Sequence, residues 1–223
     1  MSDITLPGRV DVPARVDTEH RDDGVIRAMD VTIVTLALIF LLPLMILIAV
    51  AVFLQDGGPV LFAHRRIGRD GRPFYCLKFR SMTVGAEARL AALLASSPTA
   101  RAEWARDHKL RIDPRITSLG AFLRRSSLDE LPQLLNVLRG EMSIVGPRPI
   151  VEAEITRYGR RFRHYCSVRP GITGLWQVSG RSDVDFEQWM ELDLRYVDQW
   201  SRAFDLWILV KTVPAVFLGR GAR

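Results

Sequence analysis

A long run of apolar positions near the start of the chain predicts a membrane segment. From Val31 to Leu54 the sequence holds 24 residues without a charged side chain. At about 1.5 Å of rise per residue, a helix of this length covers a hydrocarbon core of about 30 Å. We therefore place a membrane helix at residues 27–55, after a flexible tail at residues 1–26 that lacks hydrophobic periodicity.

Pro43 lies near the middle of this run and predicts a kink, because proline has no N–H for the helix ladder. A kinked segment can cross the bilayer or return to the face from which it entered, and the residues alone leave both topologies open. Basic residues are more numerous after the run than before it, which favours a cytoplasmic C-terminal part. A cleavable signal peptide is disfavoured because a tail of 30 residues with mixed charge precedes the run.

Two shorter apolar runs flank the turn signal Asp70-Gly71 and predict a β-hairpin. In its second arm, residues 75–80, the side chains alternate with period two, as in a half-buried strand. Lys78 and Arg80 are therefore expected to point to the same side of this strand.

Helical spacing prevails in the rest of the chain. Residues 84–95 and 100–109 predict two short helices broken at Ser96-Ser97-Pro98, and leucines recur at helical spacing over 128–138. These patterns predict a mainly α fold with a small β-hairpin or sheet, of the α+β class. We expect one domain over residues 56–223.

Three further helical patterns permit contact with a membrane surface. An arginine-rich face over residues 150–165 is either solvated or in contact with anionic lipid. Aromatic positions over 186–200 and an apolar patch over 206–217 predict helices that are either interfacial or buried. The second patch is too short, and too interrupted by Lys211 and Pro214, to span a bilayer.

The charge balance narrows the class of partner. The 223 residues include 31 Lys and Arg against 25 Asp and Glu, a net charge of +6, so an anionic partner is favoured over a cationic one. Phosphates, anionic lipid and nucleic acid all fit this charge. The two cysteines, Cys76 and Cys166, are too few and too far apart for a disulfide scaffold or a zinc cluster. They indicate a reducing compartment, so we expect the working part in the cytosol.

The candidate chemistry centres on the adjacent carboxylates Asp129 and Glu130, just before the leucine pattern. The segment from Ser127 to Glu130 matches a capping box, in which both acids would merely be favoured by the helix dipole. Pro132 favours a helix start nearer Asp129, because proline is tolerated in a first turn and disrupts a helix further in. The two acids are then expected at the mouth of a helix.

Several arginines near this helix mouth suit a phosphate ligand. A helix N-terminus presents unpaired N–H groups to anions, and Arg124, Arg125 and Arg148 could supply planar forks for phosphate oxygens. Two carboxylates at such a site suggest one nucleophile that attacks phosphorus and one ligand for a divalent cation such as Mg²⁺.

Three stretches of the chain closely resemble the bacterial sugar transferase family. They are Lys78-Phe79-Arg80-Ser81-Met82, the segment from Leu123 to Pro149, and Arg169 to Val178 followed by Gly180-Arg181. The resemblance covers about residues 27–218. Within this family, the chain resembles the monotopic polyprenyl-phosphate phosphoglycosyl transferases, and among them the short form that initiates exopolysaccharide synthesis.

The resemblance implies a reaction and a set of roles. A sugar 1-phosphate would pass from a UDP-sugar to undecaprenyl phosphate with release of UMP, in two steps through a covalent enzyme intermediate. Asp129 looks like the nucleophile and Glu130 like its Mg²⁺-associated partner. Arg124 and Arg148 match phosphate-binding positions, and weaker donor-site candidates are Lys78, Arg80, Gln177 and Arg181.

The resemblance also implies a topology and a location. The family's membrane helix is re-entrant and breaks at a Ser-Pro pair, whereas Leu42 precedes Pro43 in this chain, so re-entry would depend on the proline alone. We expect a monotopic protein of the bacterial inner membrane, with interfacial amphipathic helices and its catalytic part on the cytoplasmic face. The expected partners are the UDP-sugar, undecaprenyl phosphate and the lipid bilayer. Nucleic acid is not expected, and a homo-oligomer is left open.

Two rival functions have weaker support. Asp183-Val184-Asp185 matches the D-x-D pattern with which some glycosyltransferases hold a metal while moving the sugar alone. That reaction would release UDP rather than UMP. A non-enzymatic membrane adaptor with a basic surface would leave the clustered acids and arginines unexplained.

Overall fold

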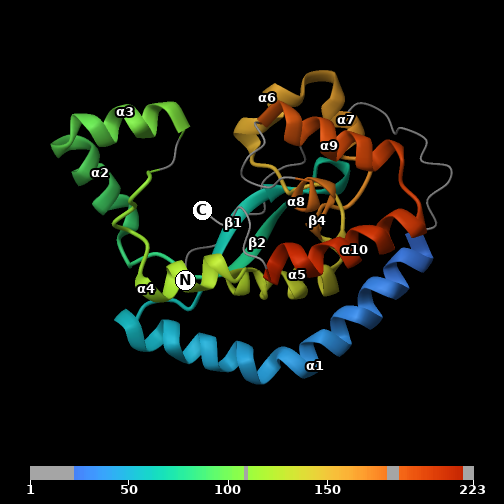
Figure 1. The fold of residues 1–223 in the computed structure, drawn as a ribbon, viewed down its shortest axis with the longest axis horizontal. Coiled ribbons are helices and arrows are strands. Elements are labelled where there is room, and N and C mark those ends of the chain that lie inside the picture. The colour runs from blue at the N-terminus through green and yellow to red at the C-terminus, as the bar shows by residue number, and fades with distance from the viewer. Residues whose placement is uncertain (1–22, 108–109, 180–185, 218–223) are drawn as a thin grey trace.

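We describe the fold from a computed structural model, which defines residues 23–107, 110–179 and 186–217. The helices are α1 (Asp23–Asp56), α2 (Ala86–Ser96), α3 (Pro98–Asp107), α4 (Ser118–Arg125), α5 (Gln133–Arg139), α6 (Ile155–Tyr158), α7 (Phe162–Tyr165), α8 (Leu175–Val178), α9 (Phe186–Asp198) and α10 (Arg202–Phe217). The strands are β1 (Leu61–Ile67), β2 (Pro73–Phe79), β3 (Ser143–Val145) and β4 (Gly171–Thr173), and the 3₁₀ turns are η1 (Arg69–Gly71), η2 (Leu128–Glu130), η3 (Glu152–Glu154) and η4 (Gly159–Arg161). The predicted class, mainly α with a small β-hairpin, is confirmed (Figure 1).

Strands β1 and β2 form the predicted antiparallel hairpin, in a register that places Leu61 opposite Phe79. Its turn uses positive φ angles at Asp70 (57°) and Gly71 (67°). Two such angles in a row match the twist of the flanking strands, which is why an Asp-Gly pair signals a hairpin.

A second sheet, of the parallel strands β3 and β4, was not predicted. Each strand has only three residues, too few for a period-two pattern to be recognised. The chain segments after β3 and before β4 approach very closely, since a Cβ added to Gly146 would lie 2.6 Å from the Gly171 nitrogen. Glycine at these positions therefore permits the contact.

Helix α1 carries the apolar run and is the one described helix that is long and apolar enough to cross a membrane. It continues through Pro43 and bends along the lower side of the domain (Figure 1). Its middle part, residues 35–47, has no fully buried side chain, and large apolar residues such as Phe40 (78% exposed) face outward.

Both ends of α1 pack against the same domain. Near its start, Val34 is buried in a cluster with residues of β2 and α5, and near its end Val52 is buried in a cluster with Leu123 of α4. Ion pairs tie the two ends as well, because Asp23 pairs with Arg69 and Asp56 pairs with Arg80. The ends of the helix are thus held to one body, and its apolar middle is left uncovered.

Helices α2 and α3 confirm the expected pair of short helices broken at Ser97-Pro98. Proline is well placed at the start of α3, where its missing N–H has no helical partner to lose, and the Ser97 hydroxyl accepts the Ala100 N–H at 3.2 Å. The pair projects from the upper left of the domain in Figure 1.

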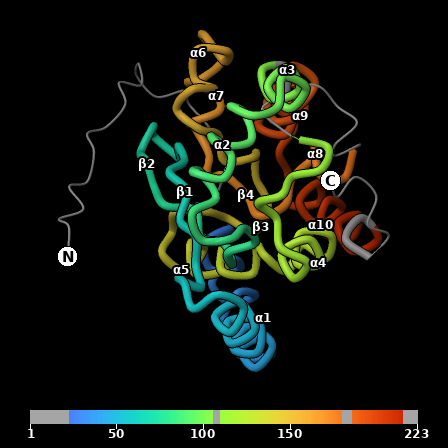
Figure 2. Tube along the Cα trace, turned by 90° about the vertical axis from the view of Figure 1, so that its left-hand side faces the viewer, coloured from blue at the N-terminus to red at the C-terminus, as the bar shows by residue number. Residues whose placement is uncertain are grey.

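The arginine-rich face predicted over residues 150–165 lies on the segments α6, η4 and α7. Gly159 (φ 51°) divides this stretch, while Tyr158 and Phe162 are buried on its inner side. Figures 1 and 2 place α6 at the opposite end of the domain from α1. The arginines therefore lie far from the apolar helix that would meet a lipid surface, which favours the solvated alternative.

Helix α10 extends through Lys211 and Pro214 and ends at Phe217. It is half buried, because Ile208 lies in the core while Leu206, Val210 and Val213 are more than half exposed. The predicted apolar patch is therefore a helix with one buried and one open apolar side.

Replacement of Gly120 by alanine is expected to destabilise the domain by about 2 kcal/mol. Gly120 lies in α4 against the backbone of Ser81, and an added Cβ would fall 1.9 Å from the Ser81 carbonyl oxygen. Chemical denaturation of the detergent-solubilised protein would measure the change, with the exposed Ser118→Ala in the same helix as the control. Equal stability of the two variants would contradict the close packing of α4 on this segment.

Candidate active site

Asp129 and Glu130 lie in the short turn η2, between α4 and α5. Ser127 enters the turn with φ 57°, and in the described structure its side chain makes no capping hydrogen bond. The next helix, α5, begins only at Gln133, with Pro132 as its N-cap. The capping-box alternative is therefore wrong, and the acids belong to a turn ahead of the helix rather than to its first turn.

Asp129 is buried, with 6% of its surface exposed. Burial, and to a smaller extent the neighbouring Glu130, raise the pKa of its carboxyl group, whereas Lys78 and Arg124 act to lower it, and the net result is a pKa of about 6. A carboxylate that is costly to ionise yet flanked by cations is typical of a functional site. At neutral pH Asp129 is mostly ionised and more basic than an ordinary aspartate.

Lys78 reaches the acid pair from β2, since its ammonium Nζ lies 2.6 Å from Oε1 of Glu130. Burial alone would lower the pKa of Lys78, but the carboxylates of Glu130 and Asp129 outweigh burial and raise it. Lys78 therefore stays charged and supplies a fixed positive charge beside both acids.

Arg124 approaches Asp129 from the last turn of α4. Its Nε donates to the Ser81 hydroxyl at 2.8 Å, and its charge acts on Asp129. The tight contact of Gly120 with Ser81 positions this turn of α4. Arg125, the next residue, is exposed in the same turn.

Arg80 lies elsewhere, although it is close to Lys78 in sequence. Strand β2 ends at Phe79, and the Arg80 guanidinium pairs with Asp56 and donates to the Val52 carbonyl at 3.3 Å, both in α1. Lys78 and Arg80, which were expected to point to the same side of the strand, therefore have different partners, Glu130 and Asp56. Arg80 anchors the end of α1.

Arg148 follows β3, and its charge acts on His64 and Arg66 of β1. Its side chain donates to Glu154 at 3.1 Å and lies over the Trp189 ring at 4.7 Å, while its backbone N–H donates to the Asp193 carboxylate at 3.2 Å. The His64 ring in β1 links the two regions, because Arg148 and Lys78 both act on it electrostatically.

The remaining residues that were predicted to bind the donor are Gln177 and Arg181. Gln177 is in α8, where its amide donates to the Ile172 carbonyl at 3.2 Å. Arg181 and the Asp183-Val184-Asp185 motif fall outside the described residues. Within the described ranges, no three acidic, His or Cys side chains gather as a ready-made metal site.

Comparison with known proteins decides the family. The family model described as "Bacterial sugar transferase" matches residues 22–219. The chain belongs to this family. It is therefore an enzyme of the transferase class.

Several relatives of this sugar transferase have names that state a reaction or a biological process. The chain is 50% identical over 196 residues to the exopolysaccharide production protein ExoY of Sinorhizobium fredii, covering 88% of this chain and 87% of that one. It is equally similar to an undecaprenyl-phosphate galactose phosphotransferase of Salmonella typhimurium, and 41% identical to a UDP-glucose:undecaprenyl-phosphate glucose-1-phosphate transferase of Escherichia coli. The chain spans 41% of the length of each of these two larger relatives.

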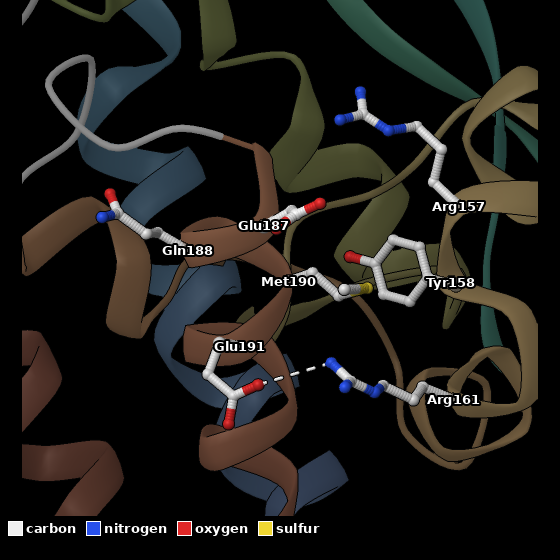
Figure 3. A pocket seen from close by; sticks show the side chains of 7 residues that line it. All are labelled: Arg157, Tyr158, Arg161, Glu187, Gln188, Met190 and Glu191. Atoms are coloured by element: carbon white, nitrogen blue, oxygen red, sulfur yellow. Dashed lines mark hydrogen bonds and ion pairs between the residues drawn. The ribbon is translucent and has the colours of Figure 1, made fainter.

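A pocket of about 590 Å³ lies on the transferase between the segment α6–η4 and helix α9 (Figure 3). It is lined by Arg157, Tyr158, Arg161, Glu187, Gln188, Met190 and Glu191, and an ion pair of 3.5 Å joins Arg161 to Glu191. None of the candidate site residues lines it. We therefore place the chemistry at Asp129 and not in this pocket.

Asp193 and His64 were not among the predicted site residues of the transferase. A signal existed for Asp193, the one charged position in an aromatic stripe over residues 186–200, since a charge on a buried face needs partners. No signal existed for His64, because its neighbours come from β2 and from the segment after β3.

The stability of the transferase is expected to fall between pH 6 and pH 8 because of Asp193. Burial raises the pKa of this carboxyl group to about 8, so the folded state keeps a proton that the unfolded chain has released, and each rise in pH favours unfolding. Asp193→Asn should flatten this slope and gain about 2 kcal/mol at pH 8. Thermal melts across this range would measure it, and parallel slopes for both proteins would contradict it. The pKa of Asp129 is lower, about 6, so Asp129 affects the slope mainly below pH 6.

Proposed function

We propose that this sugar transferase moves a sugar 1-phosphate from a UDP-sugar to undecaprenyl phosphate and releases UMP. The names of its relatives support both the lipid acceptor and the sugar-phosphate group. The observation that carries the chemical mechanism is the burial of Asp129 among Lys78, Arg124 and Glu130. The reaction would be the first membrane step of exopolysaccharide or related glycan synthesis, as the name of the ExoY relative suggests.

In the first step, a carboxylate oxygen of Asp129 attacks the β-phosphorus of the donor. A bond forms between this oxygen and phosphorus, and the bond from phosphorus to the bridging oxygen breaks, so that UMP leaves. Lys78 and Arg124 offset the negative charge where the two anions meet. The raised pKa of Asp129 supports this role, since it makes the carboxylate a stronger nucleophile while leaving it mostly ionised at pH 7.

In the second step, a phosphate oxygen of undecaprenyl phosphate attacks the same phosphorus. The bond from phosphorus to Asp129 breaks, the carboxylate is restored, and the lipid carries the sugar on a diphosphate. The same cations serve both steps, because each step brings an anion against a phosphorus atom that already bears negative charge. One small cluster is thus sufficient for a reaction with two phosphate substrates.

Magnesium is part of the proposal. Two adjacent carboxylates are the hard oxygen donors that Mg²⁺ prefers, and it commonly takes its other ligands from water and substrate phosphates. Glu130 would hold the ion, which offsets the charge of the donor diphosphate when bound. Removal of divalent cations with EDTA is expected to stop the reaction and added Mg²⁺ to restore it. Full activity in EDTA would contradict this assignment.

We propose further that α1 enters the membrane and returns to the cytoplasmic face. Both ends of the helix are tied to one domain, through the pairs Asp23–Arg69 and Asp56–Arg80, and this arrangement supports re-entry over spanning. The open apolar side of α10 would lie in the interface of the same inner membrane. Tags at the two termini should be equally protected from a probe outside spheroplasts. A tag at one end that reacts from outside would show a spanning helix.

The covalent mechanism is tested by incubating membranes that contain the full chain with UDP-sugars labelled in the β-phosphate, without lipid acceptor. Label is expected to remain on the protein, and UMP should be released in equal amount. Absence of label on the protein, together with release of labelled UDP once undecaprenyl phosphate is added, would support the rival reaction, in which the sugar alone is transferred to the acceptor.

A further inference from the structure

An exposed aromatic pair lies beside the proposed reaction centre and takes no part in the fold core. The rings of Phe62 and His64 in β1 are nearly parallel, at 23°, with centroids 5.9 Å apart. Phe62 is 53% exposed, and His64 is exposed as well. The two rings stack on each other, and the exposure of Phe62 leaves ring surface on which a planar ligand can stack.

The register of the hairpin places this pair next to Lys78. Phe62 lies directly opposite Lys78, and His64 opposite Cys76, and residues opposite each other in an antiparallel pair share one face of the sheet. Their Cβ atoms are about 5 Å apart in such pairs. A ligand on the rings would therefore begin within one side-chain length of the contact between Lys78 and Glu130.

The surroundings of the rings are cationic rather than apolar. Although part of His64 is exposed, partial burial of its ring lowers its pKa, and the charges of Arg66, Lys78 and Arg148 lower it further against the opposing charge of Glu154, so His64 is neutral at pH 7. A neutral ring stacks on a flat base without the cost of dehydrating a charge. Three cations around a stacking surface suit a ligand with a planar ring at one end and phosphates at the other.

We propose that Phe62 and His64 form the stacking surface for the uracil base of the donor nucleotide. The proposal rests on the proposed function, since it locates the part of the donor that leaves as UMP. The diphosphate would run from this surface toward Lys78 and Arg124, with its β-phosphorus at Asp129. The isoprenoid chain of the lipid acceptor is the other ligand that could pack on the rings. The three cations around His64 favour an anionic ligand over a hydrocarbon chain at this place.

The first test compares Phe62→Ala with Tyr75→Ala in the labelling reaction without acceptor. Tyr75 is a matched control because it is a partly exposed aromatic residue of the same hairpin, opposite Arg65 and so on the other face. Phe62→Ala is expected to raise about ten-fold the UDP-sugar concentration that gives half of the maximal labelling rate, which corresponds to about 1.4 kcal/mol. Phe62→Trp should restore it, and Tyr75→Ala should leave it unchanged. Equal effects of the two alanine variants would overturn the proposal.

The second test asks whether the rings contact the base itself. UMP and ribose 5-phosphate share a phosphate and a sugar, but only UMP carries uracil. UMP should inhibit labelling of the wild type about ten-fold more strongly than ribose 5-phosphate, and this ratio should approach one in Phe62→Ala and His64→Ala. An unchanged ratio would overturn the proposal.

Two further outcomes separate this inference from the function on which it rests. Transfer from the labelled wild type and from labelled Phe62→Ala to undecaprenyl phosphate should proceed at the same rate. A slower transfer in the variant, with an unchanged half-saturating concentration of the donor, would show that the rings contact the lipid, and it would overturn the proposal. If the wild type takes up no label, the covalent mechanism fails, and equilibrium dialysis of UMP against the unreacted protein and its Phe62→Ala variant still tests the stacking surface.

Discussion

Replacement of Asp129 by asparagine is expected to abolish labelling of the protein, with a loss of at least about 1,000-fold, and to make the fold more stable. The amide cannot attack phosphorus. The substitution also removes a buried group that is costly to ionise. This cost appears as the raised pKa of Asp129, about 6 against an ordinary value of 3.8. This difference means that ionisation costs the folded state up to about 3 kcal/mol above pH 6, and the variant is freed from that cost.

Asp113 is the matched control for Asp129, since it too is an aspartate with little exposure. Its carboxylate accepts from the Arg115 guanidinium at 2.7 and 2.8 Å. Burial acts to raise the pKa of Asp113, but these hydrogen bonds prevail and lower it. Asp113→Asn is therefore expected to destabilise the fold. Thermal melts at pH 7.5 and labelling of both variants would check the contrast, and a less stable Asp129→Asn would contradict a functional role for its burial.

Replacement of Lys78 by methionine is expected to slow labelling at pH 7 by about 100-fold and to shift the acid limb of the pH profile upward by about one unit. Lys78 lowers the pKa of Asp129, which is about 6, so removal of Lys78 raises that pKa and reduces the ionised fraction at pH 7. The variant also lacks one cation that would offset the donor phosphates. Rates of labelling from pH 5 to pH 9 would measure both effects.

Arg80→Met separates this electrostatic effect from a general loss of charge. Arg80 lies two residues from Lys78, but its partner is Asp56 at the end of α1. We expect this variant to keep the acid limb of the wild type while melting at a lower temperature. A shift of the limb in Arg80→Met as large as that in Lys78→Met would contradict the assignment of Lys78 as the cation that acts on Asp129.

The features predicted correctly from the sequence are those set by neighbouring residues. The hairpin follows from Asp70-Gly71 and the alternation after it, and the break between α2 and α3 follows from Ser97-Pro98. The apolar run of α1 was evident for the same reason. In each case the signal and the structure that it specifies lie within a few residues of each other.

The features that were missed depend on contacts between distant segments. The role of Arg80 in holding the end of α1 was not predicted, because its partner Asp56 precedes it by 24 residues. The sheet of β3 and β4 joins segments that are short and well separated in the chain. The environment of His64 is built by β2 and by the segment that carries Arg148. Hydrophobic periodicity and turn signals contain no information on such pairings.

The anchoring of α1 has a consequence for the biogenesis of the protein. Arg69 and Arg80, which hold the two ends of the helix, both follow it in the chain. A ribosome therefore completes the apolar segment before either anchor has been made, and before the hairpin that carries Arg69 can form. Under the proposed re-entrant topology, the final placement of the helix would be fixed only when the hairpin has folded, so that membrane insertion and folding of the domain would be coupled.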